Sequence, residues 1–165
     1  NKTSSGLGIL VLRAARALDA GSTKAEVVEK MEDWSKKTKI LVSTKTIKYL
    51  MKSGRVSPVK GLFGKLMNLK PLLVVNERGT IDLIGKPLSS KGSRAMVIKE
   101  MHSIVEKNKV WGYSISHANN METAQVYIDE MKKLTGLDPE FVSPATPALA
   151  VHAGVGVVAL SIMLD

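Results

Sequence analysis

The chain of 165 residues has no cysteine and few aromatic residues. Without cysteine it can form neither a disulfide framework nor a thiolate nucleophile, and a zinc site would have to rely on its three histidines and on carboxylates. Aromatic residues make up only 4% of the chain, so Leu, Ile, Val, Met and Ala must build the core. The absence of cysteine fits a cytoplasmic location, which we take as an expectation.

Long apolar runs and a leader pattern are also missing. No stretch approaches the roughly 20 consecutive apolar residues of a membrane-spanning helix. The most apolar segment, residues 148–164, contains a histidine and several glycines, which favours a buried turn and strand. The first eight residues lack the pattern of a signal peptide and already resemble a helix start. We expect a protein that is not integral to a membrane, and a chain that is part of a longer protein.

Acidic residues are outnumbered by basic ones, 15 Asp and Glu against 24 Lys and Arg, for a formal net charge of +9. Such an excess can attract nucleic acid, anionic lipid or an acidic partner. The lysines are spread at helix-face spacings rather than gathered in one block, which favours a solvated surface over a nucleic-acid footprint. We expect no specific nucleic-acid partner.

Apolar periodicity and turn residues predict alternating helices and strands. The first helix is expected to begin at Ser4 or Ser5 and to end at Gly21, and Thr23 with Glu26 forms a capping box for the second. The apolar side of the first is expected to carry Leu7, Leu10, Val11, Ala14, Ala15 and Leu18, and that of the second Val27, Val28, Met31 and Trp34. Further helices are expected at 46–51, from Ser57, at 90–107 and from Asn119 or Asn120 to Gly136, and strands at 40–42, 71–75, 80–84, 110–116, 141–142 and 155–163.

These elements predict an α/β fold, a mixed sheet with a hairpin, covered by helices. The hairpin is expected because the segments 71–75 and 80–84 flank a short polar connection that contains Gly79. The pattern changes near Lys39, so we expect two parts: residues 1–38 as a helical segment from the end of a preceding domain, and residues 39–165 as an α/β domain.

The motifs of common catalytic sites are missing. There is no Gly-x-Ser-x-Gly elbow and no phosphate-binding Walker motif, and no pair of histidines has the spacing of a metal site on a helix. Gly6-Leu7-Gly8 is too short for a dinucleotide fingerprint and follows no predicted strand. We therefore expect a binding protein rather than an enzyme, without a metal or a cofactor.

The three histidines differ in their surroundings. His102 is expected on the surface of a helix, and His117 is expected to hold the turn after a strand, with a place in a cleft as the alternative. His152 stands among small apolar residues and close to Gly154 and Gly156. An imidazole beside exposed backbone N–H groups could bind a carboxylate or a phosphate. A buried histidine bonded to a carbonyl explains the pattern equally well.

Four stretches, in order, resemble the DegV family of bacterial fatty-acid-binding proteins, which includes acyl carriers of the fatty acid kinase system. They are residues 5–15, residues 49–57 with 64–73, residues 117–124, and residues 152–156. The resemblance covers nearly the whole chain but only the C-terminal part of the family's length. The Thr and Ser motifs of the family's N-terminal region have no counterpart here. The resemblance implies the C-terminal domain of a two-domain DegV-like fold, with preceding helices.

The resemblance also implies roles for individual residues. His152 would lie beside the carboxylate of a bound long-chain fatty acid, and Gly154 and Gly156 would form its turn. The family holds the acyl chain in an apolar tunnel between two domains. Candidates for the wall contributed by this chain are Leu62, Phe63 and Leu66, for which an ordinary core position is the alternative.

Partner contacts are the third implication. The loop 86–94 departs from the family's usual Arg-Thr pattern, and Arg55 and Arg94 are our candidates for contact with a partner or a phosphate. The leading hypothesis is a fatty-acid-binding domain that presents the acyl carboxylate to a fatty acid kinase. The alternative is a regulatory or interaction domain fused to a kinase-like domain, with no lipid carriage of its own.

Overall fold

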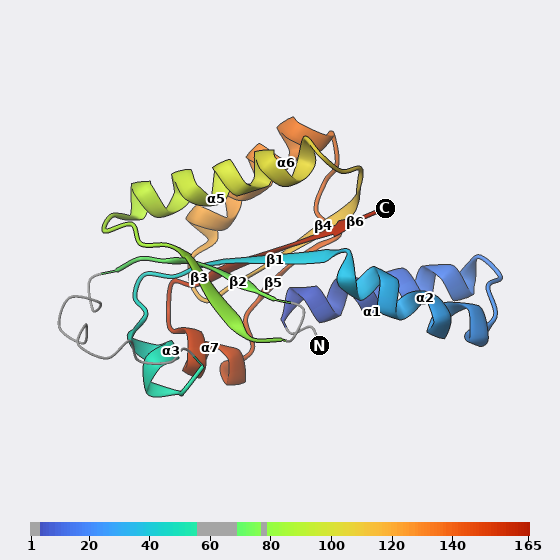
Figure 1. Cartoon of the computed structure of the whole chain (residues 1–165), viewed down its shortest axis with the longest axis horizontal. Helices are drawn as coiled ribbons and strands as arrows, with labels where there is room; N and C mark the ends of the chain where they lie inside the picture. The colour runs from blue at the N-terminus through green and yellow to red at the C-terminus, as the bar shows by residue number, and fades with distance from the viewer. Residues whose placement is uncertain (1–3, 56–68, 77–78) are drawn as a thin grey trace.

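The fold is a β-sheet with helices on both faces (Figure 1). The computed structural model describes residues 4–55, 69–76 and 79–165. Along the chain the elements are α1 (Ser5–Asp19), α2 (Lys24–Lys36), β1 (Thr38–Ser43), α3 (Lys48–Lys52), β2 (Leu72–Val75), β3 (Ile81–Gly85), α5 (Ser90–Val105), β4 (Val110–His117), α6 (Met121–Thr135), β5 (Phe141–Pro144), α7 (Pro147–Ala153) and β6 (Val158–Leu164).

The strands form one sheet in the order β3-β2-β1-β6-β4-β5. β6, the last strand of the chain, lies in the middle and pairs antiparallel with both β1 and β4. β2 and β3 form an antiparallel hairpin, and β5 runs parallel to β4. The expected mixed sheet with a hairpin is therefore confirmed.

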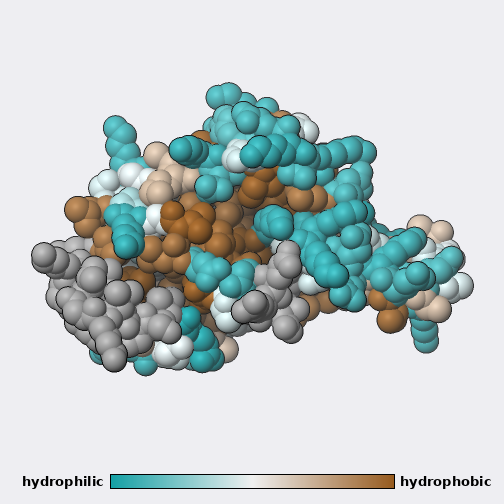
Figure 2. All heavy atoms as spheres, viewed as in Figure 1, coloured by the Kyte–Doolittle hydropathy of each residue, from teal (hydrophilic) through white to brown (hydrophobic). Residues whose placement is uncertain are grey.

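The face of the sheet toward α5 and α6 carries the largest core. The alternation of side chains along a strand sends Leu41 to this face, where it packs with Leu160 of β6 and Tyr127 of α6. In Figure 1 these two helices lie together above the sheet, and in Figure 2 their outer surface is hydrophilic, with apolar atoms gathered beneath them. Lys91, Lys99, Lys132 and Lys133 are exposed on these two helices.

The opposite face is covered in two separate places. α1 and α2 pack around Met163 near one end of β6. α3, with Leu50, packs on Leu73 of β2, and α7 lies beside α3. The expected boundary near residue 38 stays a prediction, while the structure shows that α1 packs directly on β6 and β4.

The apolar side expected for α1 was right for Leu10, which is buried, and for Ala14, which packs against the core, but wrong for three other large residues. Leu7, Val11 and Leu18 are 50%, 56% and 42% exposed, whereas Ile9 is fully buried. Gly6 and Gly8 explain why a different side of α1 faces the sheet. A Cβ at Gly6 would overlap Ile40 and a Cβ at Gly8 would overlap Phe141, so these glycines let the helix backbone approach the sheet. On α2 the capping box is confirmed, but Val28 is 72% exposed.

A second difference concerns the apolar C-terminal segment. The expectation of a turn followed by a strand from residue 155 was wrong in its first half, because residues 147–153 form α7 and β6 begins at Val158. Thr146 accepts a hydrogen bond from Leu149 N at 3.4 Å, and Pro147 occupies the first turn. These are ordinary helix-start residues. In the described ranges no helix is long and apolar enough to cross a membrane.

Candidate functional site

A pocket of about 490 Å³ lies on the sheet face that α3 and α7 cover. We call it the apolar pocket. Its floor is a row of paired strand residues: Val42 of β1 is opposite Leu73 on β2 and Ala159 on β6, and Ala159 is opposite Ser116 on β4. The floor is therefore apolar over β2, β1 and β6 and carries a hydroxyl only at β4.

The walls of the apolar pocket come from the helices. α7 contributes Leu149, His152 and Ala153, and the end of α3 with the residues that follow contributes Leu50, Gly54 and Arg55. The remaining described lining is Ser4, Ile40, Val75, Gly79, Thr80, Ile81, Ala145 and Val157. The volume falls within the about 300–1,000 Å³ of typical small-molecule sites, and the lining has their composition, mostly apolar with few polar groups.

His152 is the polar group of α7 in this pocket. It is half-buried, and its Nδ1 atom is fully buried without a hydrogen-bond partner among the described residues. A buried polar atom without a partner costs free energy, on the order of 1–3 kcal/mol. The structure thus brings the predicted His152 to a largely apolar pocket, with one of its ring nitrogens buried and without a partner among the described residues.

Hydroxyl groups gather where α1 begins, at the β4 end of the pocket. Ser4 Oγ lies 2.8 Å from Ser116 Oγ, and Ser5 Oγ lies 2.8 Å from Ser161 Oγ. Ser114 Oγ donates to the carbonyl oxygen of Ser5 at 3.1 Å. These bonds fix the first turn of α1 on the sheet, so that Ser4 lies on the pocket wall.

Gly154 and Gly156 do not line the described wall of the apolar pocket. Both have positive φ, 85° and 90°, which favours glycine. A Cβ would meet the ring of Tyr49 at Gly154 and the side chain of Lys45 at Gly156. The structure therefore explains both glycines by backbone conformation and packing, and their predicted role at a carboxylate stays a prediction.

The other predicted site residues separate. Arg55 lines the apolar pocket with His152, although the two are far apart in sequence. Arg94 lies on α5, on the opposite side of the sheet, with Nη1 3.7 Å from Glu122. Leu62, Phe63 and Leu66 lie outside the described residues.

Sequence reasoning missed the floor of the pocket. Val42, Leu73 and Ala159 were expected only as strand residues, and their period-two alternation is the signal that places them on one face.

His117 has the structural role that we favoured, because its Nδ1 accepts a hydrogen bond from Asn120 N at 3.3 Å. His102 is a half-exposed surface residue, as expected, and bonds to Glu130 at 2.7 Å.

The described residues were also compared with the requirements of a metal site. Within residues 4–55, 69–76 and 79–165 no group of three or more His, Asp or Glu side chains is placed to hold a metal ion. The polar groups that line the apolar pocket include His152, the hydroxyls of Ser4 and Ser116, and the guanidinium of Arg55.

A mixed sheet covered by helices places the chain among the α/β proteins. The chain belongs to the DegV family, because the model of that family, described as "Uncharacterised protein, DegV family", matches residues 1–165. The resemblance seen in the sequence is thereby confirmed.

Relatives show the same family and a greater length. A DegV domain-containing protein of Staphylococcus aureus is 26% identical over 164 residues, which are 97% of this chain but 57% of that relative. This chain therefore spans little more than half the length of the relatives it matches.

Solved structures share the fold. A fatty-acid-binding DegV family protein of Streptococcus agalactiae has a TM-score of 0.83 at 24% identity, over 99% of this chain and 57% of that chain. The fatty acid kinase B3 protein of Streptococcus pneumoniae, loaded with linoleic acid, has a TM-score of 0.82 at 24% identity, over 97% of this chain and 56% of that chain. At this identity the likeness shows the fold alone.

Proposed function

We propose that the protein binds a long-chain fatty acid, with the acyl chain in the apolar pocket and the carboxylate beside His152. The observation that carries this proposal is the position of an unpartnered buried imidazole nitrogen on a largely apolar pocket. On this proposal the protein is a carrier and not an enzyme.

The lining of the apolar pocket supports an acyl chain as the ligand. Each buried methylene contributes about 0.8 kcal/mol, so a long apolar slot provides most of the affinity and few polar groups are needed. The floor formed by Val42, Leu73 and Ala159 offers contacts of this kind. The fold neighbours described above as fatty-acid-binding or as loaded with linoleic acid support the same ligand class.

The polar end of the ligand needs a donor. A carboxylate only accepts hydrogen bonds, and an imidazole nitrogen that carries a proton donates one. His152 Nδ1 has no other described group to bond, so a carboxylate placed against it would satisfy both partners. Arg55, exposed and on the same pocket, would add a positive charge near the carboxylate.

The same comparison supports the proposal of a kinase partner. One fold neighbour is a fatty acid kinase B3 protein, and we propose that this protein likewise presents the carboxylate of its ligand to a fatty acid kinase. Arg55 is our candidate for the contact with that partner or with the phosphate that it transfers, since its side chain is exposed at the pocket.

The test measures ligand and affinity together. Because this chain spans 57% of the relative's length, the measurement uses the whole polypeptide that the gene encodes, produced in bacteria. We expect native mass spectrometry to detect co-purified fatty acid, and we expect His152→Ala to weaken oleate binding about tenfold, the loss of one hydrogen bond to a charged group.

The matched control is His102→Ala, which removes a histidine that bonds to Glu130 and does not line the pocket. It should leave oleate affinity unchanged. A polypeptide that carries no fatty acid and takes up no oleate would remove the proposal and would favour a regulatory domain without lipid carriage. Unchanged oleate affinity in His152→Ala would remove the role of the histidine alone.

A further inference from the structure

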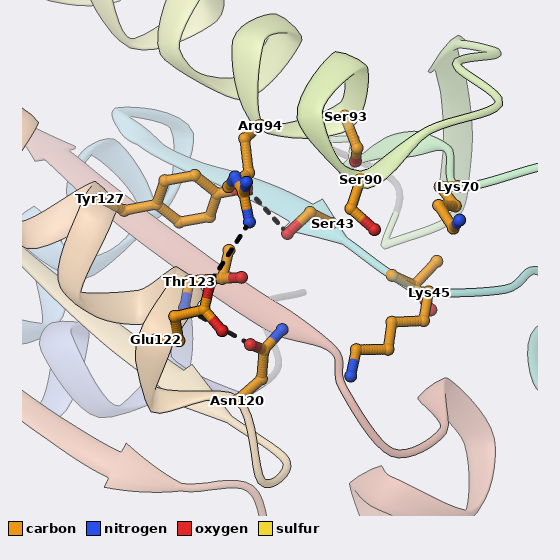
Figure 3. A pocket seen from close by; sticks show the side chains of 11 residues that line it. Ser43, Lys45, Lys70, Ser90, Ser93, Arg94, Asn120, Glu122, Thr123 and Tyr127 are labelled. Atoms are coloured by element: carbon orange, nitrogen blue, oxygen red, sulfur yellow. Dashed lines mark hydrogen bonds and ion pairs between the residues drawn. The ribbon is translucent and has the colours of Figure 1, made fainter.

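A second pocket, of about 280 Å³, lies between the end of β1 and the first turns of α5 and α6. We call it the basic pocket. Its lining is polar: Ser43, Thr44, Lys45, Lys70, Ser90, Ser93, Arg94, Asn120, Glu122, Thr123 and Tyr127 (Figure 3). An acyl chain would gain little here, so the basic pocket calls for a different kind of ligand.

Ser93 is the first indication of that ligand. The residue is 4% exposed, and its Oγ is buried with no hydrogen-bond partner in the described part of the chain. Figure 3 shows its side chain descending from α5 toward Ser90 and Ser43, on the pocket side of the helix. A buried hydroxyl without a partner is rare in folded proteins, and a ligand in the pocket would supply the missing acceptor.

The charges around the pocket indicate an anion. Lys45 in the loop after β1, Lys70 in the loop before β2 and Arg94 of α5 line it, together with the single carboxylate of Glu122 (Figure 3). Arg94 Nη1 lies 3.7 Å from Glu122, whose side chain is 86% exposed, so this pair leaves much of the arginine's charge free. Of these three cations the sequence singled out only Arg94, because Lys45 and Lys70 come from other parts of the chain.

The backbone adds to the positive potential. α5 has 16 residues and α6 has 15, and both begin at this pocket. The first turn of a helix leaves backbone N–H groups without partners and carries the positive end of the helix dipole. Ser89 Oγ accepts from Gly92 N and Asn120 Oδ1 accepts from Thr123 N, so the side-chain caps satisfy only part of these donors.

The bottom of the pocket is fixed and uncharged. Tyr127 OH donates to Ser43 Oγ at 3.0 Å, and burial raises the pKa of Tyr127, so its phenol stays neutral. The pocket thus combines an uncharged bottom with three cations and the N-termini of two helices. This arrangement suits a compact, multiply charged oxyanion.

We infer that the basic pocket binds a phosphoryl group, with Ser93 Oγ donating to one oxygen and Lys45, Lys70 and Arg94 neutralising the charge. The ligand is either free phosphate or the phosphate of a small monoester. The inference does not depend on fatty-acid binding, because the basic pocket opens on the α5 and α6 side of the sheet and the apolar pocket on the other.

The experiment titrates the whole polypeptide with inorganic phosphate, and separately with glycerol 3-phosphate, followed by amide NMR and calorimetry in a chloride buffer of constant ionic strength. Saturable shifts at residues around α5 and α6 are expected with both, and the tighter of the two identifies the source of the phosphoryl group. Phosphate that shifts nothing, or shifts no more than the matched chloride, overturns the inference.

Variants provide the second arm. Ser93→Ala is expected to weaken phosphate binding about tenfold, as the loss of a hydrogen bond to a charged group does. Its urea midpoint should stay equal or rise, because the variant removes an unpartnered buried hydroxyl. Lys45→Met and Lys70→Met are expected to weaken phosphate binding, whereas Lys48→Met, at an exposed lysine of α3 outside the lining, should not. Ser93→Ala that binds phosphate as the wild type does contradicts the inference.

Discussion

Asn120 Nδ2 donates a hydrogen bond of 2.7 Å to the carbonyl oxygen of Gly156, across 36 residues of sequence. The bond joins the first turn of α6 to the loop between α7 and β6. In the same place Gly156 N donates to Ala118 O at 2.6 Å. The loop that follows His152 is thus tied to the cap of α6, and this connection lies between the two pockets.

The first prediction separates two hydrogen bonds of the Asn120 side chain, the one donated to Gly156 O and the one accepted from Thr123 N. Asn120→Asp keeps an acceptor for Thr123 N and loses the donor to Gly156, so we expect a loss of about 1 kcal/mol in the free energy of unfolding. Asn120→Ala loses both bonds and should cost about 2–3 kcal/mol. Urea denaturation measures both values. Asn108→Ala, which removes an exposed amide bonded to Ile104 O, should change stability by less than about 0.5 kcal/mol. Equal stability of wild type and Asn120→Asp would show that the bond to Gly156 contributes nothing.

The second prediction concerns Gly154, whose φ of 85° and ψ of 162° are accessible essentially to glycine alone. Gly154→Ala should cost about 3 kcal/mol or more in urea denaturation, because backbone strain adds to overlap with Tyr49. Gly136→Ala is the matched control: its φ is 74° but nothing lies within 4 Å of the added Cβ, so about 1 kcal/mol is expected. If both variants lose the same stability, the contact with Tyr49 plays no part.

Much of the fold could be predicted from local sequence. The capping box at Thr23, the turn at Gly79 and the helix end at Gly136 act through neighbouring residues, and the structure confirms the elements that they delimit. The orientation of α1 could not be predicted in this way. It depends on Gly6 and Gly8 approaching Ile40 and Phe141, which are distant in sequence.

The two candidate sites also differ in how far local sequence reveals them. His152 could be singled out because its neighbours in sequence are small and apolar, and the structure brings it to the apolar pocket. α7 was missed because an apolar run of this length is compatible with strand or helix. The helix-start signal of Thr146 and Pro147 was not used. The basic pocket could not be found from sequence, since Lys45, Lys70 and Ser93 meet only through tertiary packing.

The third prediction concerns alkaline pH. Burial raises the pKa of Tyr113 to about 12, with further contributions from Asp138 and Asp129. The unfolded chain ionises near the ordinary pKa of 10.0, so the stabilisation is complete below that pH and is lost as the pH rises toward about 12. The loss should amount to about 2–3 kcal/mol. Urea denaturation between about pH 9 and pH 12 should show a smaller loss in Tyr113→Phe than in the wild type. Parallel curves would contradict the prediction.

The fourth prediction tests the course of the acyl chain in the apolar pocket. Ala145 lines this pocket, and Ala145→Leu should occupy space that about two methylene groups of the ligand would fill. Since each buried methylene contributes about 0.8 kcal/mol, oleate affinity of the whole polypeptide should fall about tenfold. Ala148→Leu is the matched control, because Ala148 is an exposed residue of α7 outside the pocket lining. Calorimetric titration with oleate measures both, and far-ultraviolet circular dichroism checks that the fold is retained. Equal loss in the two variants would place the acyl chain elsewhere, because Ala145 lines the apolar pocket and Ala148 does not.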